Sequence, residues 1–106
     1  MATGILGQAD LLAATNTTVY TTPADKKSKF TVSFCNRSTG ATTIRLALTL
    51  SPTAPFNQDY LEYGASLPAG GVIERTEIIC DQGRSVVAYS DAASVTVMVY
   101  GEEGII

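Results

Sequence analysis

The sequence predicts an all-β protein that folds as a single antiparallel β-sandwich of seven or eight strands. Short segments of alternating apolar and polar residues recur about every ten residues, turn-forming residues separate them, and no segment shows a sustained helical period. This pattern is typical of jelly-roll-like and immunoglobulin-like sandwiches. We expect one domain over residues 1–106, with an extended N-terminal arm over about 1–14 and a short C-terminal tail over 102–106.

The central stretch of the chain predicts a β-hairpin, in which Lys29–Arg37 and Thr42–Leu50 are joined by a turn at residues 38–41. Because successive side chains of a strand point to opposite faces, one apolar set must face a core. That set is Phe30, Val32, Phe34, Ile44, Leu46 and Leu48. Arg45 is expected on the opposite face, among small and hydroxyl-bearing residues, and is therefore the candidate contact residue of this pair.

The N-terminal segment is mildly apolar, and Ile5 and Leu6 are its candidate contact residues. An extended conformation is favoured over a helix, because the helix-forming window Gln8–Ala14 is short and lacks a clear cap and stop. The β-branched run Asn16–Thr22 predicts a strand that ends at Pro23.

The second half of the chain follows a proline-containing loop, Pro52–Asp59, in which Phe56 is an exposed contact candidate. Its predicted strands are Asp59–Gly64, Val72–Asp81, Ser85–Ser90 and Val95–Gly101. Val72–Asp81 ends with apolar residues on both faces, as expected for a strand that is covered on both sides. Ile105 and Ile106 end the chain after a flexible glycine, and they either dock on a neighbouring subunit or fray in solvent.

The charge pattern argues against nucleic-acid binding and membrane insertion. The formal net charge is −3, and the one basic cluster, Lys26-Lys27-Lys29, is expected in a solvated loop. No secretory signal or membrane span is expected, so synthesis should occur in the cytoplasm of the producing cell. Charged residues make up only 16% of the chain, which fits either a surface partly covered by partners or a small hydroxyl-rich β-domain.

No catalytic residue, cofactor site or metal site is expected. The chain has no histidine to act as a base or a metal ligand, and its two cysteines, Cys35 and Cys80, are too few for a zinc site. Free thiols are favoured over a cross-sheet disulfide. Glu62 and Glu74 could be cross-strand neighbours that form a surface ion-pair network with Arg75, which is favoured over a catalytic carboxylate pair.

Aromatic residues provide the remaining small-ligand option. Carbohydrate binding uses exposed aromatic rings, and Phe56, Tyr60, Tyr63 and Tyr89 are available. Packing at a sheet edge or contact within an oligomer is the favoured role for strand tyrosines. We therefore treat Tyr60 and Tyr63 as protein-interface candidates.

Nearly the whole chain resembles a family of small virion proteins of tailed phages, including cyanophages. The resemblance rests on strand and turn motifs rather than on a reactive signature. The matching motifs are Ile5-Leu6-Gly7-Gln8-Ala9-Asp10-Leu11, Thr18-Val19-Tyr20-Thr21-Thr22-Pro23, Val32-Ser33-Phe34-Cys35-Asn36-Arg37, Ile44-Arg45-Leu46-Ala47, Asp59-Tyr60-Leu61-Glu62-Tyr63, Leu67-Pro68-Ala69-Gly70-Gly71-Val72-Ile73-Glu74-Arg75-Thr76 and Val97-Met98-Val99-Tyr100-Gly101-Glu102-Glu103.

The resemblance implies a non-enzymatic structural role in the virion. The expected partners are other virion proteins, either the major capsid protein or tail and neck proteins, together with further copies of this chain. A capsid decoration (cement) protein is the favoured assignment, because a compact domain without a fibre repeat or coiled coil suits a surface clamp. The alternative is a tail, neck or fibre component, including a carbohydrate-binding receptor module.

Overall fold

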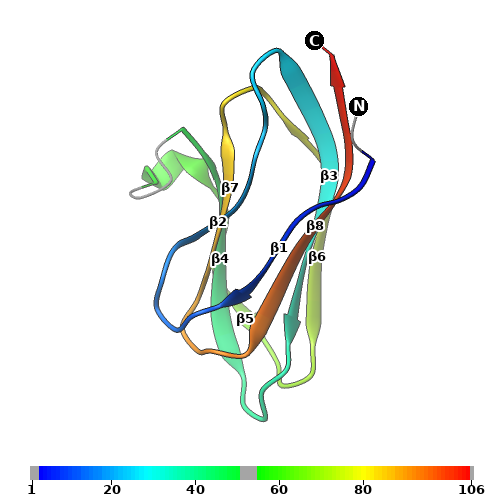
Figure 1. The fold of residues 1–106 in the computed structure, drawn as a ribbon. Helices are drawn as coiled ribbons and strands as arrows, with labels where there is room; N and C mark the ends of the chain where they lie inside the picture. Colours follow the sequence, from blue (N-terminus) through cyan, green and yellow to red (C-terminus); the bar gives the residue numbers. More distant parts are fainter. Residues whose placement is uncertain (1–2, 51–54, 106) are drawn as a thin grey trace.

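The chain forms two four-stranded antiparallel sheets that pack face to face, as the computed structural model in Figure 1 shows. The model describes residues 3–50 and 55–105. Sheet A has the order β1-β8-β3-β6, and sheet B has the order β2-β7-β4-β5. The strands are β1 (Thr3–Leu11), β2 (Thr17–Thr21), β3 (Lys26–Asn36), β4 (Thr42–Thr49), β5 (Tyr60–Leu67), β6 (Val72–Cys80), β7 (Ser85–Ser90) and β8 (Val95–Ile105). The predicted all-β sandwich is confirmed.

The strands pair as nested partners, which defines the topology as a jelly roll. β4 pairs with β5, β3 with β6, β2 with β7, and β1 with β8. Two further ladders, β3 with β8 and β4 with β7, complete the sheets. This wrapping of a long antiparallel ribbon is the eight-stranded arrangement of jelly rolls, so it selects the jelly-roll-like alternative over the immunoglobulin-like one. Strand β1 begins and strand β8 ends at the same end of the sandwich, where Thr3 pairs with Glu102 (Figure 1).

The predicted hairpin between the two central strands is wrong, because β3 lies in sheet A and β4 lies in sheet B. The connection between them crosses from one sheet to the other, and the buried Asn36 holds the crossing. Its amide nitrogen donates to the carbonyl oxygens of Gly40 (2.9 Å) and Leu67 (3.1 Å), and its side-chain oxygen accepts from the Ser38 N–H (2.9 Å). The turn after Leu67 also leads from one sheet to the other, in this case from sheet B to sheet A.

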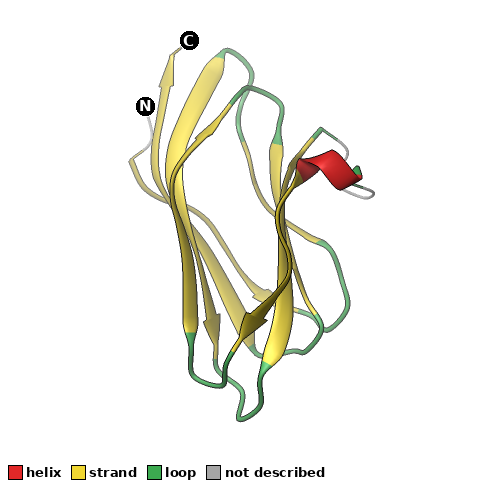
Figure 2. Cartoon of the chain, turned by 180° about the vertical axis from the view of Figure 1, so that it is seen from behind, coloured by secondary structure: helices red, strands yellow, loops and turns green. Residues whose placement is uncertain are grey.

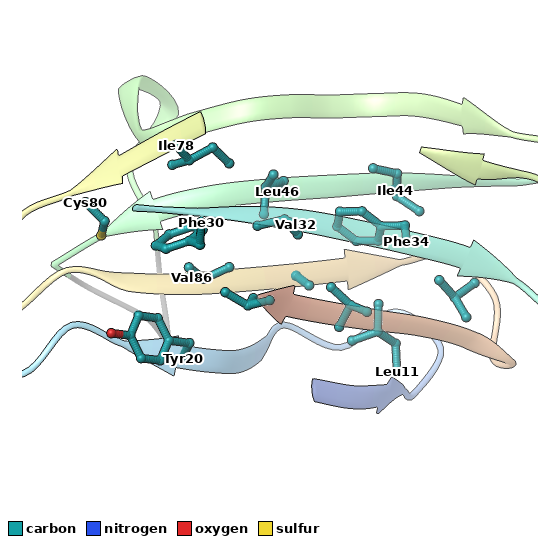
Figure 3. Packing of buried hydrophobic residues seen from close by; sticks show 14 of the residues in the cluster. Leu11, Tyr20, Phe30, Val32, Phe34, Ile44, Leu46, Ile78, Cys80 and Val86 are labelled. Atoms are coloured by element: carbon teal, nitrogen blue, oxygen red, sulfur yellow. The ribbon is translucent and has the colours of Figure 1, made fainter. Parts of the chain in front are cut away.

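The core lies between the sheets, and the alternating residues predicted to fill it do so. Figure 3 shows side chains of both sheets that point into this space. Phe30, Val32 and Phe34 of β3 pack with Ile44 and Leu46 of β4, while Leu48 is only partly buried. The end of β6 differs from the prediction that both of its faces are covered, since Ile79 is 72% exposed.

The N-terminal arm forms a strand over Thr3–Leu11, which is one of the two edge strands of sheet A. Its Leu6 packs against the core, whereas Ile5 is exposed. At Gly7 the strand passes close to β2, where an added Cβ would lie 2.2 Å from the Val19 carbonyl oxygen. This contact brings the edges of the two sheets together on this side.

The C-terminal tail likewise belongs to a strand, because β8 continues to Ile105 and its last backbone pair is with Lys26. Ile106 lies outside the described residues. The basic cluster that was expected in a loop opens strand β3 instead.

Candidate functional site

The outer face of sheet B carries a row of three side chains from three neighbouring strands. Arg45 of β4 lies opposite Tyr63 of β5 on one side and opposite Tyr89 of β7 on the other. The guanidinium carbon of Arg45 is 4.4 Å from the centroid of each tyrosine ring. Both rings therefore make cation–π contacts with one arginine. Because Ile44 and Leu46 face the core, alternation along β4 directs Arg45 outward.

A third ring extends this row. Tyr60 contacts Tyr63 edge to face, with ring centroids 4.9 Å apart and an interplanar angle of 82°. It lies opposite Ala47, which is fully buried beneath the outer face. Arg45, Tyr60, Tyr63 and Tyr89 together form the tyrosine–arginine face. Tyr63 is 64% exposed and the other three are half-buried, so the face is open to a partner.

Arg45 differs from the other three arginines in its polar partners. Arg37 forms an ion pair with Asp10, Arg75 with Glu62 at 2.5 Å, and Arg84 with Asp81 at 3.0 Å and Asp59 at 3.8 Å. Within the described residues, 3–50 and 55–105, Arg45 has no carboxylate partner and no hydrogen bond. Its nitrogen donors are therefore available for a group outside the chain.

The structure brings together three of the predicted contact residues: Arg45, Tyr60 and Tyr63. Phe56 is 63% exposed and directly precedes the short 3₁₀ helix η1 (Asn57–Asp59), which protrudes beside sheet B in Figure 2. The backbone N–H of Phe56 donates to an Asp59 carboxylate oxygen at 2.9 Å, and this hydrogen bond holds the chain at the start of η1.

The predicted contact residues of the N-terminus do not belong to this face. Ile5 lies on sheet A opposite Tyr100, and Leu6 packs against the core. Ile105 is the last residue of β8, and its backbone pairs with Lys26 of β3 in sheet A. The tyrosine–arginine face thus contains three of the contact residues predicted from the sequence, Arg45, Tyr60 and Tyr63. Its fourth residue, Tyr89, was considered only as a carbohydrate-stacking residue. Its place beside Arg45 depends on the β4–β7 ladder, which no local pattern indicates.

The acidic residues of β5 and β6 are arranged differently from the prediction. Glu62 and Glu74 are not cross-strand neighbours, because β5 and β6 are edge strands of different sheets. Glu62 binds Arg75 and so links the two edges. Glu74 accepts a hydrogen bond from the Tyr100 hydroxyl at 2.8 Å on the outer face of sheet A, and this bond raises the pKa of Tyr100.

A second polar cluster lies inside the sandwich, near the end of β8. The buried Tyr20 hydroxyl donates to Glu103 at 2.6 Å and lies 2.6 Å from the Ser28 hydroxyl oxygen. Burial, reinforced by the Glu103 carboxylate, raises the pKa of Tyr20 to about 12. Burial also raises the pKa of the nearby Cys80 thiol, which disfavours the reactive thiolate. This cluster therefore joins β2, β3 and β8 and has a structural role.

Cys35 and Cys80 are both free thiols, as favoured by the sequence. They lie toward opposite ends of the β3–β6 ladder, where Cys35 pairs with Val72 and Cys80 pairs with Ser28. Among the residues that the structure describes, no cluster of three potential metal ligands is found. No helix in the same residues is long and apolar enough to cross a membrane.

Comparison with known proteins identifies no relative: no family model, no curated protein and no solved structure matches the chain.

Proposed function

We propose that this chain is a non-enzymatic structural protein of a phage virion, a capsid decoration (cement) protein that binds the major capsid shell. Two features support the proposal apart from the candidate site. The strand and turn motifs resemble those of small tailed-phage virion proteins. The jelly roll is also an architecture of viral capsid domains, although it serves lectins and other proteins too, so this support is by analogy of fold.

The observation that carries the proposal is the tyrosine–arginine face. Tyrosine and arginine are the residue types in which protein interfaces concentrate binding energy. Here four such side chains are gathered on one sheet face, and the contacts of Arg45 with Tyr63 and Tyr89 hold them in place before a partner arrives. Restricting these side chains in advance lowers the entropy that is lost on binding. A protein partner, another virion subunit, is therefore the ligand that suits the face.

The test is to measure how much of the chain purified virions contain. Quantitative mass spectrometry should give a copy number comparable to that of the major capsid protein, and cryo-electron microscopy should show the jelly roll on the shell. The tyrosine–arginine face should lie against a neighbouring subunit. Virions that lack the chain altogether would contradict the proposal.

A tail, neck or fibre component that binds carbohydrate is the second candidate. The exposed ring of Tyr63 favours it, because sugars stack on exposed aromatic rings. This candidate predicts a low copy number at one vertex or on the tail. It also predicts that the Tyr63→Ala variant loses binding to host-surface glycans while remaining folded.

A further inference from the structure

We infer that the tyrosine–arginine face recognises a carboxylate, an Asp or Glu side chain presented by a neighbouring virion protein, and that Arg45 binds it. This inference rests on the proposed function and names the chemistry of the partner. It begins from the one arginine that lacks an acidic partner in the described residues.

The environment of Arg45 favours the binding of a carboxylate. Its side chain is half-buried between two rings, so part of its hydration is lost already. A guanidinium that contacts ring faces keeps its N–H groups in the plane of the fork, where they match a carboxylate in a bidentate pair. The aromatic rings also shield such a pair from water, which strengthens it relative to an exposed ion pair.

The carboxylates near this face are already engaged within the chain. Asp91, which follows β7, accepts a hydrogen bond from Thr43, the preceding outward-facing residue of β4. Glu62 of β5 is bound to Arg75 at the edge between the sheets. Within residues 3–50 and 55–105, the acidic side chains thus leave Arg45 without an ion pair, and the complementary charge would come from another molecule.

Phosphate or nucleic acid fits the face less well than a carboxylate on a protein surface. Anions with several charges are bound by several cations, whereas this face presents a single arginine, and the lysines begin strand β3 in the other sheet. The surrounding tyrosines add apolar and hydroxyl contacts of the kind that protein surfaces provide.

The first measurement uses a probe that does not depend on the particle. The folded, ¹⁵N-labelled protein is titrated with poly-L-glutamate, and the Arg45 Nε–H resonance is followed by NMR. We expect saturable shifts for Arg45 and for the ring protons of Tyr63 and Tyr89, with none for Arg37, which is paired with Asp10 on the surface. Absence of an Arg45 shift would overturn the inference. A larger response to polygalacturonate than to poly-L-glutamate would assign the face to acidic glycans, and would also overturn it.

The second measurement uses purified particles that lack the chain. Arg45→Gln, which keeps most of the side chain but removes its charge, should weaken particle binding at least about tenfold. Arg45→Lys retains the charge but not the planar fork, so it should fall between wild type and Arg45→Gln. Arg37→Gln is the matched control and should bind like the wild type. Far-UV circular dichroism checks that all four proteins are folded.

The outcomes separate the inference from the proposed function. Equal binding of wild type and Arg45→Gln to particles would overturn the inference and leave the virion role intact. Wild-type protein that does not bind particles would instead refute the cement role, and the poly-L-glutamate titration would then decide the inference by itself.

Discussion

The two outer faces of the sandwich use similar residue types in opposite ways. On sheet A, the Tyr100 hydroxyl donates a hydrogen bond to Glu74. On the same sheet, Lys29 lies directly opposite Glu102 in the β3–β8 ladder. On sheet B, Arg45 is held by Tyr63 and Tyr89 without an acidic partner in the described residues. The first face therefore directs polar groups toward one another, whereas the second leaves a cation free among aromatic rings.

This difference is the basis for proposing the outer face of sheet B as the partner-binding face. Exposed ion pairs and hydrogen bonds within one chain contribute little to stability. They also leave few charged or hydrogen-bonding groups unpaired for a partner to bind. An ordered cation without a counter-charge can still form an ion pair with an acidic group of another molecule. Sheet B is therefore the face on which substitutions should alter binding, and sheet A is the natural control.

The largest effect should come from removing the rings of the tyrosine–arginine face. We expect the double variant Tyr63→Ala/Tyr89→Ala to weaken particle binding about 30-fold or more, because buried tyrosines at interface centres act as hot spots. Tyr100→Ala on sheet A should bind like the wild type. Binding is measured by co-sedimentation with particles that lack the chain. Equal losses for the two proteins would remove the distinction between the faces.

Substitution of Tyr20, which lies inside the sandwich, should have the opposite effect: it should alter stability without altering particle binding. Tyr20→Phe removes a buried hydroxyl that contacts Ser28 and Glu103, which should lower the free energy of unfolding by about 1–2 kcal/mol. Urea denaturation at neutral pH measures this loss. Particle binding of the folded variant should equal that of the wild type, and a binding defect would show that the interior cluster takes part in recognition.

The same variant has a pH signature. Folding raises the pKa of Tyr20 from 10.0 to about 12, so the folded state favours the protonated hydroxyl. The resulting stabilisation is complete below pH 10 and is lost as the pH rises from about 10 to about 12. Tyr20→Phe should lack this part of the alkaline destabilisation, which parallel urea denaturations across that range would reveal.

Arg75, which links the edges of the two sheets, should differ from Arg45, which we propose to contact a partner. Glu62→Gln leaves Arg75 without its carboxylate at the junction of the sheet edges, and should cost about 1 kcal/mol of unfolding free energy. Particle binding should not change. Asp10→Asn, which unpairs the more exposed Arg37, is the control and should alter stability by less than about 0.5 kcal/mol.

The smallest effect should appear on the outer face of sheet A. Glu74→Gln removes the negative acceptor of the Tyr100 hydroxyl, so the raised pKa of Tyr100 should fall toward its ordinary value. The ¹³Cζ resonance of Tyr100, followed through an alkaline titration, reports this change. A pKa that stays where it was would show that Glu74 is not the cause of the shift.

Much of the fold could be predicted because strand periodicity is a local property. The alternation of Phe30, Val32 and Phe34 identified a strand and its inward face, and both are confirmed. The hairpin prediction failed because alternation specifies a face without specifying the neighbouring strand. Asn36 was expected only as a residue of the strand Lys29–Arg37, yet its buried amide joins two crossings between the sheets.

The sequence predicted residues of the candidate site but not how they assemble. Arg45 was identified as outward-facing from its position between Ile44 and Leu46, and Tyr60 and Tyr63 were identified as surface aromatics. Their assembly with Tyr89 requires the ladders of β4 with β5 and β7, which join distant parts of the chain. Local composition contains no information on such pairing.

The sequence by itself determined the strands, their inward faces and the low charge of the chain, because side-chain alternation and composition act through near neighbours. Tertiary structure decided which strands became neighbours, since nested jelly-roll pairing satisfies backbone hydrogen bonds across large sequence separations. It also decided which carboxylates reached which arginines. That distribution left Arg45 between two tyrosines, with its charge directed outward.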